Sequence, residues 1–354
     1  FMREKTYYAQ LCLIQVASEE EEAIIDPLAK GMDLAPLLKL LANKNVLKVF
    51  HAARQDIEIF YTLMGEVPGP LFDTQVAAMA CGYGDQVGYE PLVRATTGQE
   101  VDKGSRFTDW SKRPLSKKQL HYALGDVTHL VKVYKTLRKQ LKTTGRDEWV
   151  AEEMADLDQP ALYRTLPEDA WKRIRLRNIK PKELGVLIKV AAWREEEAQQ
   201  KDLPRGRVLK DDALTDLARV GPEDVESLGA LRAIPNGFER SRSAKGLLKA
   251  IAAGKAIPKE ELPLVKGKPN RIPAPPDVVD LLRVLLKRQS EKHEVAPKLL
   301  ASAADLESIA LDDEAEVPAL KGWRREVFGS LALDLKQGKL SLGLKGKSVE
   351  LIRR

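Results

Sequence analysis

The sequence predicts an α/β domain with a mixed sheet flanked by helices at residues 1–145, followed by two all-α bundles. Three observations support this fold class. Strand and helix patterns alternate over the first third of the chain, helical segments alone follow one another from about residue 114, and a stretch rich in Pro and Gly interrupts them. The length of 354 residues also exceeds the usual size of one hydrophobic core, so two or three domains are expected.

Short apolar, aromatic and β-branched runs in the first third indicate strands, and apolar residues at helical spacing follow two of them. Asp33 is expected to cap the first of these helices and Gly65 to end the second. After a loop marked by two prolines, a short strand is expected to run directly into a further helix. The predicted strands lie at 7–17, 23–28, 46–52 and from 71, and the predicted helices at 34–43, 54–65 and up to about 84.

Beyond residue 114 we find almost no strand pattern. The stretch LPLVKGKPNRIPAPP holds five prolines and one glycine and is expected to be an interdomain linker. We therefore divide the chain into a first domain, a helical domain that includes a connecting helix, a linker and a second helical domain. The boundaries are 1–145, 146–262, 263–274 and 275–354.

Composition excludes several classes of protein. No apolar run approaches the roughly 20 residues that would cross a bilayer, and the first residues lack the cleavage site of a secretory signal. Cys12 and Cys81 are the only cysteines, so a zinc site or a disulfide framework is excluded and two reduced core thiols are expected. With four histidines, no nucleophilic-serine motif and no Gly-rich phosphate loop, we expect a cytoplasmic protein whose chemistry depends on carboxylates.

The charge of the chain is mildly basic, at +6, but it is unevenly placed. Residues 101–145 hold 11 basic and 3 acidic side chains. Such a concentration suits a polyanionic partner, because neutralising phosphates releases counterions. Solvated lysine-rich helix faces give the same count, so both interpretations stay open.

Two carboxylates stand in settings that suggest catalysis. Asp56 follows a buried strand and opens a helix in HAARQDIEIF, whereas Tyr122 and Asp126 lie four residues apart in QLHYALGDVTHL. That spacing places a phenol and a carboxylate on one helix face, one turn apart. A metal-binding carboxylate beside a tyrosine that orients water is what metal-assisted phosphodiester hydrolysis requires. Taken alone, a Tyr-x-x-x-Asp pair also occurs by chance on helix surfaces.

A longer set of motifs resembles one known family. The runs FMREKTYYAQLCLIQ, HAARQD, FDTQ and SRFTDWSKRPLSKKQLHYALGDV resemble the ribonuclease D family, in the tyrosine-bearing branch of the DEDD exonucleases, in content, order and separation. The helical units resemble HRDC domains, most clearly in AAWREEEAQQKDLPRGRVLKDDAL. The resemblance implies a ribonuclease H-like exonuclease domain followed by two HRDC-type bundles.

The resemblance also implies an activity: hydrolysis of the 3′-terminal phosphodiesters of RNA to 5′-nucleoside monophosphates by a two-metal mechanism using Mg²⁺ or Mn²⁺. Asp56 and Asp126 would bind metal, and Tyr122 would orient the attacking water. The implied partners are tRNA precursors and other structured RNAs with single-stranded 3′ tails. The implied protein is monomeric, acts in tRNA 3′-end maturation and has no membrane partner.

The sequence departs from the family pattern at its start. The family's first motif, Asp-x-Glu, directly precedes a residue that matches Phe1, so two further carboxylates are expected upstream of Phe1. Two neighbouring divalent ions need several anionic ligands, so we expect the chain as written to be inactive. Two rival functions remain: a proofreading-type DNA 3′→5′ exonuclease with the same carboxylates, and a non-catalytic RNA-binding protein.

Other side chains are weaker candidates for contacts with the substrate. His51 precedes Asp56 and would approach the terminal nucleotide or be a structural histidine, whereas Asp73 is expected to cap a helix. Aromatic rings and cations near residue 110 would stack on bases and contact phosphates, or pack the loop onto the domain. The substrate-binding candidates are Phe1, Gln15, His51, Arg106, Phe107, Trp110 and Lys112, with Arg113 in the same basic stretch.

In the helical units, Trp193 and Trp323 are expected to be core residues. The basic side chains Arg205, Arg207 and Lys210 would touch an RNA backbone or carry solvated loop charge.

Overall fold

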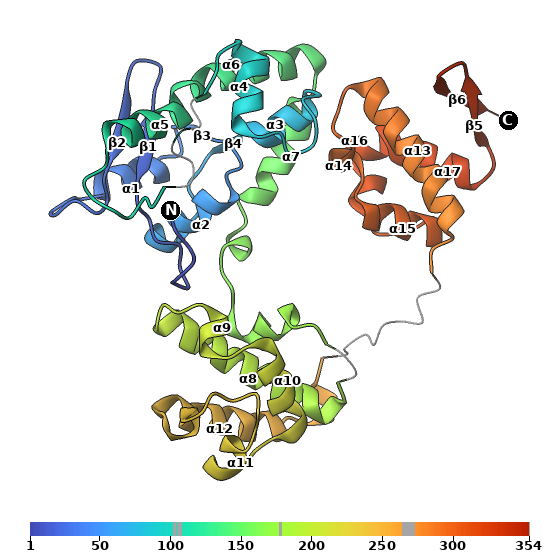
Figure 1. Ribbon diagram of the computed structural model, residues 1–354. Helices are drawn as coiled ribbons and strands as arrows, with labels where there is room; N and C mark the ends of the chain where they lie inside the picture. The colour runs from blue at the N-terminus through green and yellow to red at the C-terminus, as the bar shows by residue number, and fades with distance from the viewer. Residues whose placement is uncertain (102–103, 105–107, 177–178, 264–272, 354) are drawn as a thin grey trace.

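The computed structural model describes residues 1–101, 104, 108–176, 179–263 and 273–353. Figure 1 shows three units: an N-terminal α/β domain in blue to green, a first helical domain in yellow, and a C-terminal helical domain in orange to red. Each unit has its own hydrophobic core. Most of the linker predicted at 263–274 lies outside the described residues.

The strands of the N-terminal domain form two pairs. β1 (Ile14–Ala17) and β2 (Glu22–Ile25) are antiparallel, whereas β3 (Lys48–Phe50) and β4 (Leu71–Asp73) are parallel. Both strand directions therefore occur in this domain, as expected of a mixed arrangement. The prediction that a strand begins at residue 7 was wrong, because the preceding segment turns back on itself through a bridge between Met2 and Gln10.

Helices surround these strands. The second helix ends at Gly65 in the left-handed conformation (φ 76°), as predicted. Asp33 lies one residue before the N-cap position, where its carboxylate accepts a hydrogen bond from the Ala35 amide at 2.8 Å. The helices of this domain are α1 (Ala35–Ala42), α2 (Arg54–Met64), α3 (Thr74–Ala80), α4 (Tyr89–Thr97), α5 (Lys117–Thr128), α6 (Leu130–Thr144) and α7 (Asp147–Leu157).

The connecting helix α7 packs on the N-terminal domain. Val150 and Met154 are buried in the same core as α3, α4 and α6. Tyr163 is buried against Ala53, the residue before α2, and against Ile57 within α2. The sequence analysis grouped this segment with the first helical domain. We propose that the boundary between the two domains falls after Tyr163.

The first helical domain is built around α8 (Pro181–Gln200), which packs against α10 and α12. Trp193 is buried in this core, as predicted. The remaining elements are η1 (Pro160–Leu162), which precedes the domain, and η2 (Pro167–Arg173), α9 (Arg205–Val208), α10 (Asp211–Val220), α11 (Val225–Gly229), η3 (Phe238–Arg240), α12 (Arg242–Lys255) and η4 (Lys259–Glu261).

The C-terminal domain packs short helices on α13 (Pro276–His293). Trp323 was predicted to be a core residue, but it lies between this domain and the N-terminal domain, where it packs against both cores. The other helices are α14 (Pro297–Leu300), α15 (Ala303–Leu311), η5 (Pro318–Leu320), α16 (Gly322–Arg324), the π-helical turn η6 (Arg325–Gly329) and α17 (Ser330–Lys336).

A β-hairpin ends the described chain. β5 (Leu340–Lys345) pairs antiparallel with β6 (Ser348–Arg353), and Leu342 lies opposite Leu351. The prediction that strands are almost absent after residue 114 was wrong here. The alternating apolar pattern LSLGLK and SVELIR was present in the sequence, but strands this short are apparent only once the turn at Gly346 pairs them.

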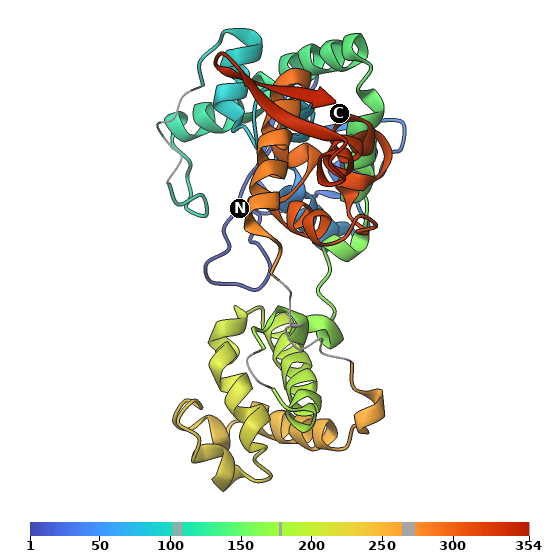
Figure 2. The same cartoon turned by 90° about the vertical axis from the view of Figure 1, so that its right-hand side faces the viewer.

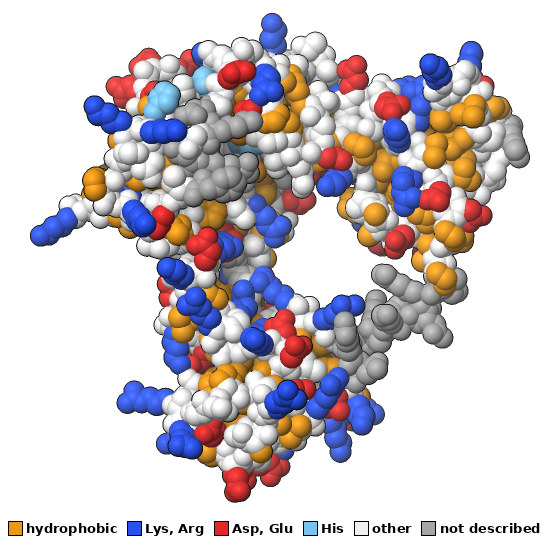
Figure 3. All heavy atoms as spheres, in the orientation of Figure 1, with side chains coloured by type: hydrophobic (Ala, Val, Ile, Leu, Met, Phe, Trp, Pro, Cys, Tyr) orange, Lys and Arg blue, Asp and Glu red, His pale blue; other side chains and the backbone are white. Residues whose placement is uncertain are grey.

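The two helical domains lie on different sides of the N-terminal domain, and the space-filling view shows an opening between the three units (Figure 3). Figure 2 shows the N-terminal loop extending toward the first helical domain. Among the described helices, none is both long enough and apolar enough to cross a membrane.

Candidate active site

Asp56 lies in the first turn of α2, and a buried carboxylate fixes the turn that presents it. Asp73, 4% exposed at the end of β4, accepts hydrogen bonds from the backbone N–H groups of Ala52 and Ala53 at 3.0 and 2.8 Å. It also accepts from Gln75 N at 2.8 Å and so caps α3, as predicted. Asp73 therefore holds the β3–α2 turn, in which Ala52 has a φ of 56°, against the start of α3.

Asp126 and Tyr122 lie on α5, one turn apart. A capping box between Ser116 and Gln119 begins this helix, so its first residue is Lys117. The Tyr122 ring stacks on Trp110 with ring centroids 5.9 Å apart and an interplanar angle of 30°. Trp110, predicted to contact substrate, therefore lies beside the tyrosine predicted to orient the water.

The electrostatics show that the two predicted metal ligands come together. Burial raises the pKa of Asp56 to about 6, with a smaller raising effect from Asp73. Asp126 borders the solvent, yet the desolvation of its carboxyl, and then the charge of Asp56, raise its pKa to about 6 as well. The Asp56 carboxyl of α2 is therefore close enough to the Asp126 carboxyl of α5 for its charge to be felt there.

This pair of carboxylates fits a divalent cation. Neither Asp56 nor Asp126 forms an ion pair with a basic side chain among the described residues. Oxygen ligands of this kind are those that Mg²⁺ and Mn²⁺ prefer. The described residues do not, however, bring together three or more Asp, Glu, His or Cys side chains that could hold a metal ion. We therefore propose that the two aspartates supply part of a metal site whose other ligands lie outside the described residues.

The backbone nitrogen of Phe1 lies near the Asp56 carboxyl group. Arg3 forms an ion pair with Glu58 of α2 at 2.8 Å, which fixes the start of the described chain along the same helix. The Phe1 side chain is 40% exposed and therefore accessible to a substrate.

His51 lies in the interior behind the site. Its Nδ1 lies 3.0 Å from Thr74 Oγ1, and its ring lies 5.6 Å from the ring of Tyr89. Burial lowers the pKa of His51, and its Nε2 is buried without a hydrogen-bond partner among the described residues. These contacts favour the structural alternative for His51.

Tyr89, on α4, was missed by the sequence reasoning. Its hydroxyl donates to the carbonyl oxygen of Gly125 at 3.3 Å, one residue before Asp126. Burial, and then the charge of Asp126, raise the pKa of Tyr89. No local motif marks this residue, because its partner lies 36 positions away in the sequence.

The basic stretch before α5 is only partly available to a substrate. Arg113 donates to both Asp26 oxygens at 2.7 and 2.6 Å, and also to the carbonyls of Cys12 and Trp110. It therefore packs the Trp110 segment onto β1 and β2, which was the alternative to phosphate contact. Lys112 is exposed. Arg106 and Phe107 lie outside the described residues.

Gln15 lies in the middle of β1 opposite Ile24 and is half-buried. Its position places it on the short antiparallel pair that α5 packs against.

Comparisons with known proteins identify the two parts of the chain. A family model described as a 3'-5' exonuclease matches residues 1–142, and a model of the HRDC domain matches residues 183–251. Ribonuclease D of Granulibacter bethesdensis is 51% identical over 353 residues, covering 99% of this chain and 89% of that protein. Ribonuclease D of Nitrobacter hamburgensis is 51% identical over 354 residues, covering 100% of this chain and 92% of that protein.

A solved structure matches the same architecture. The crystal structure of Escherichia coli RNase D, described as an exoribonuclease involved in structured RNA processing, superimposes with a TM-score of 0.79 at 30% identity. The match covers 96% of this chain and 91% of that one. Enzymes of this family depend on divalent metal ions, in accord with the raised pKa values of the neighbouring carboxyl groups of Asp56 and Asp126. The chain belongs to the ribonuclease D family of 3′→5′ exoribonucleases.

Proposed function

We propose that this chain removes 3′-terminal nucleotides from RNA as 5′-nucleoside monophosphates, with Asp56 and Asp126 as metal ligands and Tyr122 as the residue that orients water. The observation that carries this proposal is that burial raises the pKa of both Asp56 and Asp126 to about 6, and that the charge of Asp56 adds to the shift at Asp126. Two carboxylates with raised pKa values in one site are a mark of function rather than of stability.

Different side chains would bind the metal ions, position the metal ligands and orient the attacking water. Two bound divalent ions, Mg²⁺ or Mn²⁺, would polarise the phosphate, activate water and stabilise the leaving oxygen. Asp56 and Asp126 supply oxygen ligands from two helices, and Asp73 positions the turn that carries Asp56. Stacking on Trp110 fixes the Tyr122 ring, so the phenol is oriented before the substrate arrives.

Two further carboxylates of the site are proposed to precede Phe1. Because the backbone nitrogen of Phe1 lies near Asp56, a residue directly before Phe1 would lie close to the same site. An Asp-x-Glu at that place would add the anionic ligands that a second ion needs. The proposal is therefore made for a protein that carries these residues.

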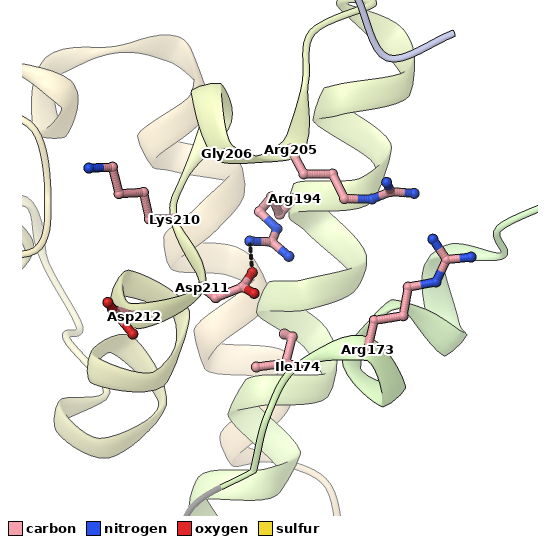
Figure 4. Close-up of a pocket in the computed structure, with 8 residues that line it drawn as sticks. All are labelled: Arg173, Ile174, Arg194, Arg205, Gly206, Lys210, Asp211 and Asp212. Atoms are coloured by element: carbon pink, nitrogen blue, oxygen red, sulfur yellow. Dashed lines mark hydrogen bonds and ion pairs between the residues drawn. The ribbon is translucent and has the colours of Figure 1, made fainter. Parts of the chain in front are cut away.

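The proposed substrates are tRNA precursors and other structured RNAs with single-stranded 3′ tails, acted on by a monomer in the cytoplasm. A basic recess of about 430 Å³ in the first helical domain supports contact with an RNA backbone (Figure 4). Arg173 and Lys210 line it, and neither forms an ion pair with the described acidic residues. Arg194 and Arg205 line it too, but they pair with Asp211 and Glu195.

A time course on a 5′-labelled, 3′-extended tRNA with Mg²⁺ or Mn²⁺ tests the proposal, using protein that includes any residues encoded before Phe1. Stepwise shortening from the 3′ end is expected, and a matched DNA oligonucleotide tests the preference for RNA. Asp126→Asn is expected to reduce turnover at least 10³-fold, because a metal ligand is lost, with RNA binding retained.

The matched control is Asp280→Asn on α13, whose exposed carboxylate pairs only with Arg283 among the described residues. It should leave turnover unchanged. Wild-type turnover by Asp126→Asn would overturn the metal-site assignment, and RNA binding without shortening in the wild type would favour a non-catalytic protein.

A further inference from the structure

The N-terminal loop reaches from the active site to the first helical domain (Figure 2). A backbone bridge between Met2 and Gln10 closes the loop, and Tyr7 and Tyr8 lie between these two residues. Asp202, just after α8, accepts hydrogen bonds from the backbone N–H groups of both tyrosines at 3.0 Å. The two sides of this contact are 194 and 195 residues apart in the sequence.

The Tyr7 hydroxyl is fully used at this contact. It donates to Glu195 Oε1 of α8 and accepts from Gln199 Nε2 at 3.1 Å and Arg205 Nη2 at 2.9 Å. One donor and two acceptor positions are all that a hydroxyl offers. The Arg205 guanidinium also lies over the Tyr7 ring, 4.7 Å from its centroid, as a cation–π contact.

Glu195 is the buried carboxylate at the centre of this contact. It is 1% exposed, and its two oxygens accept from Arg205 at 2.5 and 2.6 Å. A buried carboxylate must have its oxygens satisfied, and removing one donor leaves a costly unpaired acceptor. Tyr7, which belongs to another domain, supplies the remaining hydrogen bond to Glu195. We call Tyr7, Glu195, Gln199, Asp202 and Arg205 the Tyr7 latch.

The two ends of the loop segment contact different domains. At one end, the backbone nitrogen of Phe1 lies near Asp56, and the ion pair between Arg3 and Glu58 holds this end on α2 independently of the latch. At the other end, Tyr7 holds Arg205, which also lines the basic recess. The latch therefore lies between the active site and a surface suited to the phosphates of the same RNA strand.

We propose that Tyr7 is a positioning residue that holds the first helical domain, with its basic recess, in one place relative to the active site. The inference rests on the proposed function. Two binding surfaces held at a fixed separation act on one strand with a high effective concentration, which falls when the connection becomes flexible. The latch should therefore strengthen the binding of RNA long enough to reach both surfaces, without taking part in the chemistry.

Kinetics on two substrates test this inference in the full-length protein. Tyr7→Phe keeps the ring but removes the hydroxyl. It is expected to raise the KM for a 3′-extended RNA of 20 or more nucleotides about three- to tenfold at unchanged kcat, through the lost effective concentration. A dinucleotide reaches only the active site, so its kcat and KM should stay at wild-type values.

The matched control is Tyr8→Phe. Tyr8 lies in the same loop, its ring packs edge-on against Tyr7 at 4.8 Å, and its hydroxyl makes no hydrogen bond with the described residues. This variant should behave as wild type on both substrates. Asp202→Ala, which removes the acceptor for two backbone N–H groups, should reproduce the effect of Tyr7→Phe.

A distance measurement separates the inference from the proposed function. Spin labels at Glu66→Cys and Glu226→Cys, with Cys81 replaced by Ser, report the separation of the N-terminal and first helical domains. Tyr7→Phe should broaden the distance distribution and Tyr8→Phe should not. Equal distributions, or an equal change of kcat on both RNAs, would overturn the inference. A wild type that cleaves neither RNA would overturn the proposed function instead, and the distances would still test the latch.

Discussion

The two helical domains contact the N-terminal domain in physically different ways. The C-terminal domain shares a core with it: Ala296 and Leu299 are buried among residues of α3, α6 and α7, and Trp323 stacks on Trp149 with centroids 4.0 Å apart at an interplanar angle of 8°. The first helical domain is held instead by the polar Tyr7 latch. An apolar shared core is expected to fix a domain, whereas a small polar contact permits adjustment.

Backbone contacts strengthen the apolar junction. Ala296 N donates to Met79 O at 2.9 Å, and the Arg146 guanidinium donates to the carbonyl of His293 at 2.5 Å. Arg324, 8% exposed, pairs with Glu152 and Glu153 of α7. The difference between the junctions teaches that the C-terminal domain is fixed by a shared apolar core, while the first helical domain is held by the polar contacts of the Tyr7 latch.

Of the three changes considered, removal of the aromatic stack at the apolar junction should lower the free energy of unfolding most. Trp323→Ala takes away the ring between Trp149 and the Arg324 guanidinium, which lies 4.5 Å from its centroid. We expect a loss of about 2–4 kcal/mol in the free energy of unfolding, measured by urea denaturation. Leu344→Ala, at a side chain 81% exposed, is the control and should change it by about 0.5 kcal/mol or less. Equal effects would refute the shared-core interpretation.

A glycine at the apolar junction provides a more local test. Gly82 has a φ of 83°, and a Cβ added there would lie 2.7 Å from the carbonyl oxygen of Glu294. Gly82→Ala should lower the free energy of unfolding by about 1–3 kcal/mol more than Gly84→Ala. Gly84 also has a positive φ, 99°, but open space around it, so the pair isolates the interdomain clash. An equal decrease in the free energy of unfolding in both variants would show that the junction rearranges to accommodate the added Cβ without cost.

Lowering the pH should weaken the Tyr7 latch before the apolar junction. We expect this to be the smallest of the three effects. Burial alone would raise the pKa of Glu195, but hydrogen bonds from Arg205 and Tyr7, together with the charges of Arg205 and Arg173, hold it below its ordinary value. Its ionised form therefore stabilises the latch above the unfolded pKa of about 4.3, and that contribution is lost as the pH falls through the folded value.

Label distances measured from pH 7 downward would check this. The distribution between the N-terminal and first helical domains should broaden below about pH 4, where glutamates protonate. Labels placed across the Trp149–Trp323 stack should keep their distance even as Glu152 and Glu153 protonate, because the shared apolar core and the stacked rings do not depend on charge. Simultaneous loss of both distances would mean that the whole fold, and not the latch, responds to pH.

Local signals in the sequence predicted much of the fold and of the site. Gly65 ended α2 where the pattern placed it, and helical spacing placed Tyr122 and Asp126 one turn apart on α5. These features depend on residues within one or two turns of each other, so propensity and capping specify them. The roles proposed for Asp56, Tyr122 and Asp126 came from motif order, and the charge coupling of the two aspartates supports them.

The features that the sequence did not reveal all depend on distant partners. Tyr7 contacts Glu195 across 188 positions, Trp323 packs on its own core and also stacks on Trp149, and His51 lies against Thr74. No local pattern encodes such pairs, because the same side chains would satisfy other partners in another packing. The sequence by itself determined the helices, the caps and the family to which the chain belongs. The tertiary structure decided which domain is fixed and which is latched, because burial and hydrogen bonding between distant segments exist only once the chain is packed.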